Sequence, residues 1–539
     1  MKNLVSIFAG HDASVSFYHA EKDKYYCIEI ERIVQDRYFR LHEDNSPHYQ
    51  KYILESCQEI AEKEWGIEND YEAVLICSDG YIQVNPREIF NTEKVTTVAR
   101  HHETHVSAAY YMSPFVGEIA RIISYDGGGD DGHFNIYIVD SEGRGIILHE
   151  ARDVDFGGRY LLCGSLIREV AEKSRHQLAL SGKLMGLCAY GKVIDKYLPA
   201  FKEFFLSPTR DEYGKWNNLY RKLAENTGLP LKNLDNPWDN PLDNWVFEGQ
   251  EGYDIAATAQ AAFEEVFIDF LKRYDGESNT NYILTGGCAL NVLLNEKIKS
   301  LYPNRSLYVP PNPHDGGLSL GHLFRYKPPT KRVDVTYSGS PLLDRDKLQT
   351  YIDQYGASKI TKKEIAELIK DGKIVGLVYG DSEVGPRALG NRSIVCDPNI
   401  ADMKDILNSK VKFREWYRPF APFCKKEDAE KYFSSRNFDN LEYMSYAPDV
   451  KQEYRDKLPA ITHVDGTARL QVVTEESHPH FYELLTEFGK ISETNVLLNT
   501  SFNIRGYPIL SSIKDALYAL NNTQMDYVII EDFIFKKKP

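Results

Sequence analysis

Paired cysteines are missing from this sequence. Its eight cysteines lie far apart and none forms a CxxC pair, so neither a zinc ribbon nor a disulfide framework is expected. Reduced, mostly buried thiols fit better. Long hydrophobic runs are missing as well: the one before His11 is too short for a signal-peptide core or a membrane span, and no other stretch approaches a span. These absences predict a cytoplasmic location and no membrane partner.

Positive charge is in deficit. The 64 lysines and arginines are outnumbered by 79 aspartates and glutamates, which gives a net charge of −15. A nucleic-acid partner held by a general basic surface is therefore not expected. We also find no GxSxG elbow with a Ser-His-Asp order and no GxxxxGK[ST] phosphate loop. A GxGxxG dinucleotide fingerprint is excluded too, because GGGDDG is too polar and lies in a predicted hairpin.

The length of 539 residues exceeds one ordinary core, which favours two domains. The stretch YKPPTKRVDVTYSGSP carries prolines and lacks apolar periodicity, as linkers do. We therefore place the domains at residues 1–335 and 345–539. Residues 196–250 are rich in Lys, Asp, Asn, Trp and Pro and predict a helical insertion with loops. This insertion either covers a cleft or is a surface elaboration without function.

Two similar hairpins are predicted in the first half. LVSIFA, GHDAS and VSFYHA form a strand, a polar turn and a strand, and ARIISY, DGGGDDG and HFNIYIVD repeat that pattern. Between them, a helical pattern from about Pro47 to Trp65 precedes the short buried strand AVLIC. Two such hairpins in one domain indicate a duplicated α/β unit.

Four glycine and aspartate turns follow apolar strands: GHDAS, DGGGDDG, TGGCALN and HDGGLS. Backbone amides at such turns hold phosphates, and an Asp holds the bridging metal. Together the turns predict an ATP and Mg²⁺ cleft between two similar lobes, although any single one could be an ordinary tight turn. The predicted nucleotide-binding residues are Asp12, Gly127, Gly128, Gly286, Gly287 and Asn291.

The HHETH cluster predicts a metal site. His101 and His105 are spaced i, i+4, so on a helix both imidazoles project from one face. Asp126 and Asp315 lie in Gly-rich turns, from which a carboxylate can reach inward. Two histidines plus carboxylates suit Fe, Mn or Zn. The alternative is that these histidines only pack or cap a helix.

The second half carries clustered cations beside Gly, Pro and aromatic residues, in EVGPRALGNRSIVCDP, KVKFREWYRPFAPF and NVLLNTSFNIRGYPI. Arg forks and Lys point charges fit phosphates, while Asn and Ser supply neutral hydrogen bonds for a planar amide. This set suits carbamoyl phosphate plus the phosphates of ATP. The alternative is a set of structural ion pairs at a domain interface.

Taken together, these residues resemble the O-carbamoyltransferase family, which includes tobramycin, cephem hydroxymethyl and nodulation-factor carbamoyltransferases. The resemblance covers nearly the whole chain, and its most specific pieces are HHETH, YDGGGDDG, LTGGCALN, HDGGLSLG, EVGPRALGNRSI, FREWYRPFAP and LNTSFN. It implies an α/β protein. The N-terminal domain is expected to be similar to the actin-like ATPase fold of the tRNA threonylcarbamoyl transfer enzymes, and the C-terminal domain to threonylcarbamoyl-adenylate synthase, an open, twisted α/β sheet.

The resemblance also implies roles for individual residues. His101, His105, Asp126 and Asp315 correspond to the family's metal ligands, with Fe²⁺ as our first choice and Zn or Mn as alternatives. The motif HHET departs from the HHxA of close relatives, which leaves open whether His102 binds the metal instead. In the second domain the resemblance assigns residues around carbamoyl phosphate: Arg387, Lys412 and Arg418 as the basic groups, and Asn499 and Ser501 as the polar strand.

The expected reaction has two steps. Carbamate released from carbamoyl phosphate attacks the α-phosphorus of ATP in the second domain, where Arg387, Lys412 and Arg418 offset the developing charge. Carbamoyl adenylate then reaches the first domain by a dry path. There the metal polarises the carbonyl, a hydroxyl of a small acceptor attacks, and His11 or His102 takes the proton.

Other readings stay open. A tRNA or protein threonylcarbamoyl-transfer enzyme would share these parts, although the acidic charge argues against tRNA. A non-catalytic ATP-binding protein on an actin-like fold would leave the arginines of the second half idle. A small-metabolite kinase is a lesser alternative. The acceptor is not determined by the sequence, and neither is the oligomeric state, for which a homodimer is kept open.

Overall fold

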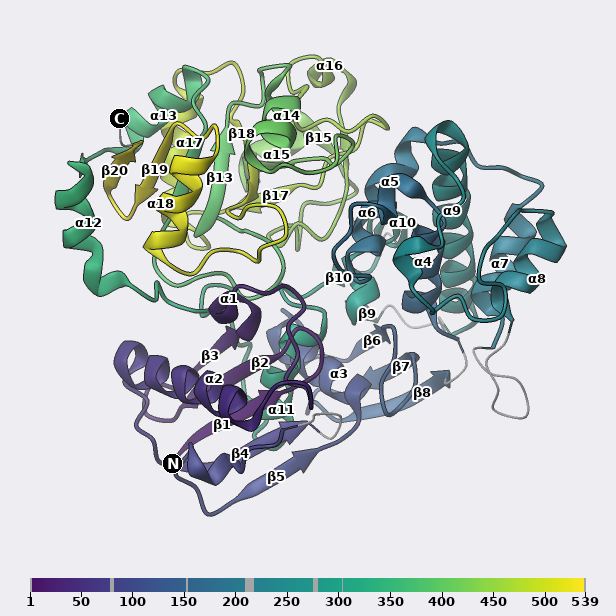
Figure 1. Ribbon diagram of the computed structural model, residues 1–539, viewed down its shortest axis with the longest axis horizontal. Helices are drawn as coiled ribbons and strands as arrows, with labels where there is room; N and C mark the ends of the chain where they lie inside the picture. The colour runs from purple at the N-terminus through teal and green to yellow at the C-terminus, as the bar shows by residue number, and fades with distance from the viewer. Residues whose placement is uncertain are drawn as a thin grey trace.

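The first sheet has five strands in the order β3-β2-β1-β4-β5. The computed structural model describes residues 2–77, 82–151, 154–208, 218–274, 280–302 and 304–537 (Figure 1). In this sheet β1 pairs antiparallel with β2 and parallel with β4. The strands are β1 (Asn3–Phe8), β2 (Ser14–His19), β3 (Lys24–Glu29), β4 (Tyr71–Cys77) and β5 (Val95–Val98).

The second sheet repeats this topology, with the order β10-β9-β6-β7-β8. Its central strand β6 pairs antiparallel with β7 and parallel with β9, as β1 does with β2 and β4. The duplicated α/β unit is therefore confirmed, including both predicted hairpins. The strands are β6 (Ala120–Tyr125), β7 (Phe134–Val139), β8 (Gly145–Ala151), β9 (Asn281–Thr285) and β10 (Leu307–Tyr308).

Two helices join the two sheets. The helix α3 (His101–Met112) packs on β6 and β9, and α11 (Leu318–Tyr326) packs on β1 and β2. The two helices also contact each other. The predicted helix after Pro47 is α2 (Pro47–Ile60), which continues as a π-helical turn to Trp65. The short α1 (Ile30–Val34) follows β3.

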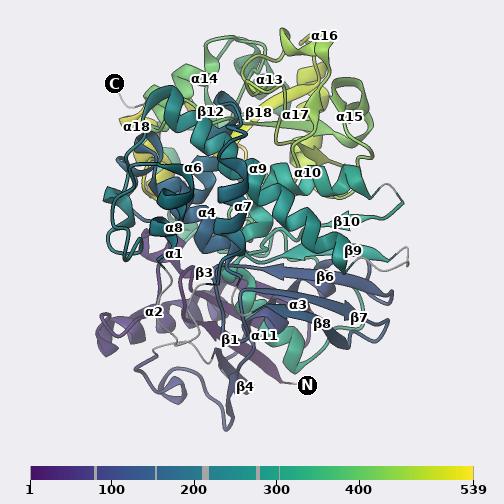
Figure 2. The same cartoon turned by 90° about the vertical axis from the view of Figure 1, so that its right-hand side faces the viewer.

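A helical group lies above the second sheet in Figures 1 and 2. The 25-residue helix α9 is its centre, against which α4, α6 and α7 pack. Where residues 196–250 are described, they form two helices and loops, as predicted; residues 209–217 lie outside the described residues. The helices are α4 (Phe156–Ser165), α5 (Arg168–Ala171), α6 (Ala179–Leu187), α7 (Leu198–Leu206), α8 (Leu219–Thr227), α9 (Gly249–Arg273) and α10 (Val292–Leu301).

The third sheet is a mixed, open sheet of eight strands in the order β11-β20-β19-β12-β13-β18-β14-β17. The helices α13 (Lys362–Lys370) and α17 (Pro479–Gly489) pack against each other beside it, and α18 (Ile513–Asn522) contacts β19. This confirms an α/β sheet in the second half. The strands are β11 (Ser358–Lys359), β12 (Val375–Val378), β13 (Arg392–Cys396), β14 (Ala421–Lys425), β17 (Gln471–Val473), β18 (Val496–Ser501), β19 (Tyr527–Ile530) and β20 (Phe533–Lys536). Smaller elements are α12 (Leu348–Tyr355), α14 (Met403–Ile406), α15 (Lys426–Tyr432), α16 (Gln452–Arg455), β15 (Phe433–Ser434) and β16 (Asp449–Val450).

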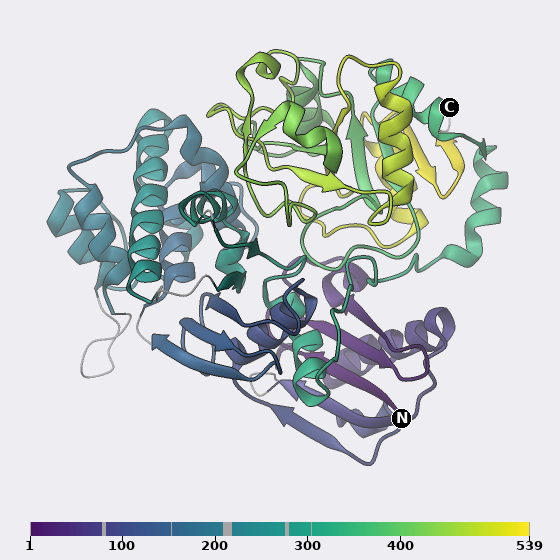
Figure 3. The same ribbon diagram turned by 180° about the vertical axis from the view of Figure 1, so that it is seen from behind.

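The predicted linker has no helix or strand between the end of α11 at Tyr326 and the turn that begins at Arg345. It crosses between the two halves and reaches α12 (Figure 3). Several of its side chains, including Val335 and Leu342, are buried, so it is packed rather than loose. The domain limits of 1–335 and 345–539 stay a prediction.

Two sequence-based expectations concern the chain as a whole. All eight cysteines are free, and seven are buried, so the prediction of unpaired, mostly buried thiols is confirmed. Among the described residues, no helix combines the length and apolarity needed to cross a bilayer.

Candidate active site

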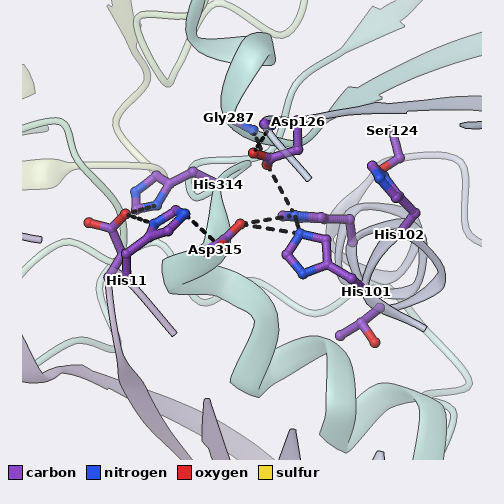
Figure 4. Close-up of polar contacts among 12 residues, drawn as sticks. His11, His101, His102, Ser124, Asp126, Gly287, His314 and Asp315 are labelled. Carbon is purple, nitrogen blue, oxygen red and sulfur yellow. Dashed lines mark hydrogen bonds and ion pairs between the residues drawn. The ribbon is translucent and has the colours of Figure 1, made fainter. Parts of the chain in front are cut away.

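The four predicted metal ligands lie together at the junction of the two sheets (Figure 4). His101 and His105 project from the first two turns of α3, Asp126 follows β6, and Asp315 opens the turn before α11. One ligand atom of each residue lies within 4.8 Å of those of the others, and all four side chains are buried. The fold thus brings the end of β6 and the N-terminal ends of α3 and α11 to one point.

The spacing of these atoms suits a shared ion. His105 Nε2 lies 3.1 Å from His101 Nε2, 3.3 Å from Asp315 Oδ1 and 3.4 Å from Asp126 Oδ2. Tetrahedral ligands about 2.1 Å from one ion are about 3.4 Å apart. Asp315 Oδ1 is buried and has no hydrogen-bond partner among the described residues. The donor set therefore fits a divalent ion, and nothing in it selects iron over zinc or manganese.

His11 lies beside this cluster. Its Nδ1 is 2.9 Å from Asp12 Oδ2, and its Nε2 is 3.4 Å from Asp315 Oδ2. Burial lowers the pKa of His11, but Asp315 and Asp12 outweigh it and raise that pKa to about 10. The side chain is 43% exposed, so a substrate can reach it.

The surroundings of His102 differ from those of His11. Its Nδ1 lies 2.7 Å from Ser124 Oγ, its Nε2 lies 2.9 Å from the Gly132 carbonyl oxygen, and the side chain is fully buried. Burial lowers its pKa to about 4, with His101 and His105 adding to the shift. Both ring nitrogens are occupied by the protein. His102 therefore anchors α3 to β6 and does not suit proton transfer or metal binding.

Two of the glycine turns surround Asp126, so their amides contact its carboxylate. The Gly127 and Gly287 amides donate to its two carboxylate oxygens at 2.6 and 2.5 Å. At Gly286, whose φ is +89°, a Cβ would lie 2.2 Å from the Tyr125 carbonyl oxygen, so only glycine fits. In this structure the Gly127 and Gly287 amides orient a candidate metal ligand, and their nucleotide-binding role stays a prediction.

Asn291 is also engaged by the protein. Its side chain caps α10 by accepting from the Leu294 amide at 3.0 Å, and it exchanges hydrogen bonds with Gln260. This explains its place in the TGGCALN motif by helix capping rather than by nucleotide binding. Asp12 and Gly128 remain beside the cluster: Asp12 bonds His11, and a Cβ at Gly128 would lie 3.4 Å from the His133 ring.

The predicted cations of the second half form another, partly buried cluster. Burial and Arg418 lower the pKa of Arg387 to about 10. Burial, Arg387, Arg414 and Arg418 lower the pKa of Arg469 well below its usual value. These shifts show that the arginines lie close enough to repel one another. An anionic ligand would relieve this repulsion.

Two polar atoms near this cluster lack partners. Arg469 Nε and Asn499 Oδ1 are buried and have no hydrogen-bond partner among the described residues. Asn499 Nδ2 donates to the Ala388 carbonyl at 2.8 Å, next to Arg387. Buried polar groups are rarely left unsatisfied, so these atoms mark a place for a ligand. Arg469 was missed in the sequence because a lone Arg before β17 belongs to no motif.

Lys412 is already engaged by the protein. Its ammonium group donates to the Ser501 carbonyl at 2.6 Å and to the Asn503 carbonyl at 2.8 Å, and it also contacts the Ser501 hydroxyl and the Asn503 side chain. An ammonium has only three protons to donate. Lys412 therefore holds the end of β18, with Ser501, and the arginines remain as the cations that face a ligand.

The turn that carries Arg387 is fixed by the first half of the chain. Arg32, which is fully buried, donates to the carbonyl oxygens of Glu383 and Gly385, both at 2.5 Å. Gly385 has a φ of +109°, and a Cβ there would lie 2.3 Å from the Pro311 carbonyl oxygen. Since Pro311 is four residues before Asp315, the turns of the two clusters are in backbone contact.

A crevice lies beside this contact. It is lined by residues of the first half, among them Ala289, Pro311 and Pro313, and by residues of the second half, among them Arg387, Tyr443 and Met444. Apolar side chains and proline rings dominate this lining. The two halves thus meet here at a tight, mostly apolar seam.

Comparison with known proteins agrees with this arrangement. The family description "Carbamoyltransferase N-terminus" matches residues 15–323, and "Carbamoyltransferase C-terminus" matches residues 366–537. Nodulation protein NolO of Bradyrhizobium diazoefficiens is 32% identical over 456 residues, covering 81% of this chain and 79% of its own. The chain belongs to the carbamoyltransferase family. It is therefore an enzyme that transfers carbamoyl groups.

Other relatives align over almost the entire chain. The 3'-hydroxymethylcephem-O-carbamoyltransferase of Streptomyces clavuligerus is 27% identical over 568 residues, covering 99% of both chains. Nodulation protein U of Azorhizobium caulinodans is 27% identical and covers 94% of both. Among solved structures, full-length HypF covers 60% of this carbamoyltransferase at 13% identity and a TM-score of 0.33, which carries no argument about fold or function.

Proposed function

We propose that this carbamoyltransferase makes carbamoyl adenylate from carbamoyl phosphate and ATP at the arginine cluster, and transfers the carbamoyl group to a hydroxyl of a small acceptor at the histidine and aspartate cluster. The observation that carries the proposal is the pairing of two unlike sites: a partly buried set of arginines, and a four-ligand centre whose Asp315 turn is in backbone contact with the turn that carries Arg387. The cephem relative, which covers the whole chain, supports a hydroxyl acceptor.

The activation step needs anion stabilisation. Water releases phosphate from carbamoyl phosphate, and a carbamate oxygen then attacks the α-phosphorus of ATP while pyrophosphate leaves. Arg387, Arg418 and Arg469 would neutralise the phosphate oxygens, and the free Asn499 oxygen would accept from the carbamoyl NH₂ group. In a buried site, donors of this kind contribute about 3 kcal/mol each to transition-state stabilisation.

The transfer step uses His11. A divalent ion held by His101, His105, Asp126 and Asp315 would supply Lewis-acid polarisation of the carbonyl. The acceptor oxygen attacks the carbonyl carbon, AMP leaves, and His11 Nε2 takes the hydroxyl proton while Asp12 holds its Nδ1. An ion bound by Asp315 and Asp126 would offset part of the negative charge that raises the pKa of His11, which favours the neutral ring that acts as a base.

The seam between the two halves would protect the intermediate. Carbamoyl adenylate hydrolyses readily, so a path that excludes water favours transfer over loss. Apolar side chains and proline rings line the contact between the two halves beside Pro311 and Arg387, and passage of the intermediate along them is part of the proposal. Fe²⁺ as the ion, a cytoplasmic location and a homodimer remain predictions from the sequence.

The test is the identity of the products. Purified protein with Mg²⁺ is expected to show ATP–pyrophosphate exchange only when carbamoyl phosphate is present, and to form AMP when an acceptor is added. ADP as the product would instead support a kinase. Exchange that needs bicarbonate and threonine would support a threonylcarbamoyl enzyme, and ATP binding without exchange would support a non-catalytic protein.

A further inference from the structure

The loop that carries Arg418 is held by a helix from the other half of the chain. Lys183, on α6, forms an ion pair with Glu415 at 2.7 Å, and both side chains are only 7% exposed. Lys183 also donates to Ser174 Oγ at 2.7 Å, just before α6. Contacts within the first half therefore hold the Lys183 ammonium group in place. Its ion-pair partner, Glu415, lies in the second half, three residues before Arg418.

Other contacts hold the same loop in place. Tyr417 donates to the Glu169 carbonyl at 3.2 Å, and the ring of Trp416 lies 4.9 Å from that of Tyr190. Since the loop backbone is anchored by these neighbours, losing the Lys183 charge would mainly change the electrostatics of the site.

Glu415 stands between two cations. Its Oε2 lies 3.7 Å from Arg418 Nη1 and has no hydrogen-bond partner among the described residues. Burial alone would raise the pKa of Glu415, but Lys183 and Arg418 outweigh it, and the net shift is downward. A buried carboxylate with a single compensating cation draws that cation close. Because Lys183 pairs with Glu415 at the shorter distance, the guanidinium of Arg418 stays 34% exposed and can face an anion.

We propose that Lys183 and Glu415 are positioning residues for the anion site: Lys183 neutralises Glu415 across the two halves, and Glu415 then orients Arg418 without capturing it. The inference rests on the proposed function, in which Arg418 binds carbamoyl phosphate. It predicts that the site in the second half is complete only when α6 of the first half contributes its charge.

The experiment measures phosphate binding by calorimetry and the KM values for carbamoyl phosphate and ATP in pyrophosphate exchange, with the full chain. Lys183→Met leaves Glu415 to capture Arg418, so we expect the phosphate Kd and the KM for carbamoyl phosphate to rise 10-fold or more, with the KM for ATP within about twofold. Lys183→Arg restores the charge and should restore both values. The double variant Lys183→Met with Glu415→Gln removes the carboxylate that captures Arg418. It should bind phosphate better than Lys183→Met alone.

The matched control is Arg168→Met, which removes a cation from the exposed ion pair with Glu248 in the same helical group and should leave all values unchanged. If Lys183→Met does not fold, the inference is tested by the phosphate Kd of Lys183→Arg and of the double variant, each compared with that of wild type. Phosphate binding that is equal in wild type and folded Lys183→Met, or a double variant weaker than the single one, would overturn the inference. Wild-type protein that binds phosphate without exchange would overturn the proposed function alone, whereas no phosphate binding would overturn both.

Discussion

The surroundings of each histidine determine what its ring can do. His11 keeps an exposed edge beside two carboxylates, whereas His102 has both nitrogens bonded to the protein. His478, far along the chain, caps α17 by accepting from the Phe481 amide at 3.2 Å, and its Nε2 lies 3.0 Å from Asn391 Oδ1. A histidine that is neutral in the folded state ties stability to pH.

We predict that His478 makes the free energy of unfolding fall at acidic pH. Burial, with His480 adding, lowers its pKa to about 3. Its stabilising contribution is therefore complete above the unfolded value of about 6.5 and is lost as the pH falls below it, by about 2 kcal/mol between pH 7 and 5. Thermal unfolding of wild type and His478→Gln at the two pH values checks this. The difference in melting temperature between wild type and His478→Gln should be smaller at pH 5 than at pH 7. An equal difference at both pH values would exclude the effect.

Residue roles could be predicted only in part from the sequence. The i, i+4 spacing of His101 and His105 predicts one helix face, and the structure places them on α3. The choice of Asp126 and Asp315 came from turn chemistry and resemblance, and the fold brings them to the histidines. Arg469 could not be found, because its proximity to Arg387 depends on strands that are distant in sequence. The engagement of Lys412 and Asn291 by the protein is equally invisible without coordinates.

At the scale of elements, local signals were reliable and distant pairings were not. Alternating residues around polar turns predict β1–β2 and β6–β7, which are joined by short turns. The third sheet pairs β12 with β19 and β13 with β18, across more than 100 residues, and no periodicity encodes that order. The turn at residues 383–392 likewise depends on distant residues, because Arg32 and Pro311 of the first half contact it.

A substitution at Gly385 tests how strongly the contact with Pro311 constrains this turn. Gly385→Ala would place a Cβ 2.3 Å from the Pro311 carbonyl oxygen, so the turn must shift and carry Arg387 with it. Pyrophosphate exchange should fall 10-fold or more, with a raised KM for carbamoyl phosphate. Gly356→Ala is the control, because Gly356 also has a positive φ, of +61°, but nothing lies within 4 Å of its Cβ position. Equal exchange in both variants would show that the contact is dispensable.

At the scale of the whole molecule, the two halves are built into each other. Arg32 and Lys183 reach from the first half into the second, and Pro311 meets Gly385. This docking leaves the two clusters close but chemically separate. One presents guanidinium groups and the other imidazoles and carboxylates, so under the proposed function activation and transfer should be separable by substitution.

The measurement that tests this division most directly is pyrophosphate exchange, with product formation, in two variants assayed side by side. His105→Ala removes a ring that lies between Asp126 and Asp315 and should retain carbamoyl-phosphate-dependent exchange within a few fold, while transfer falls at least 100-fold and bound metal is lost. Arg387→Met should lose both exchange and transfer yet keep its metal. Loss of exchange in His105→Ala with the fold intact, or normal exchange in Arg387→Met, would contradict the two-site account.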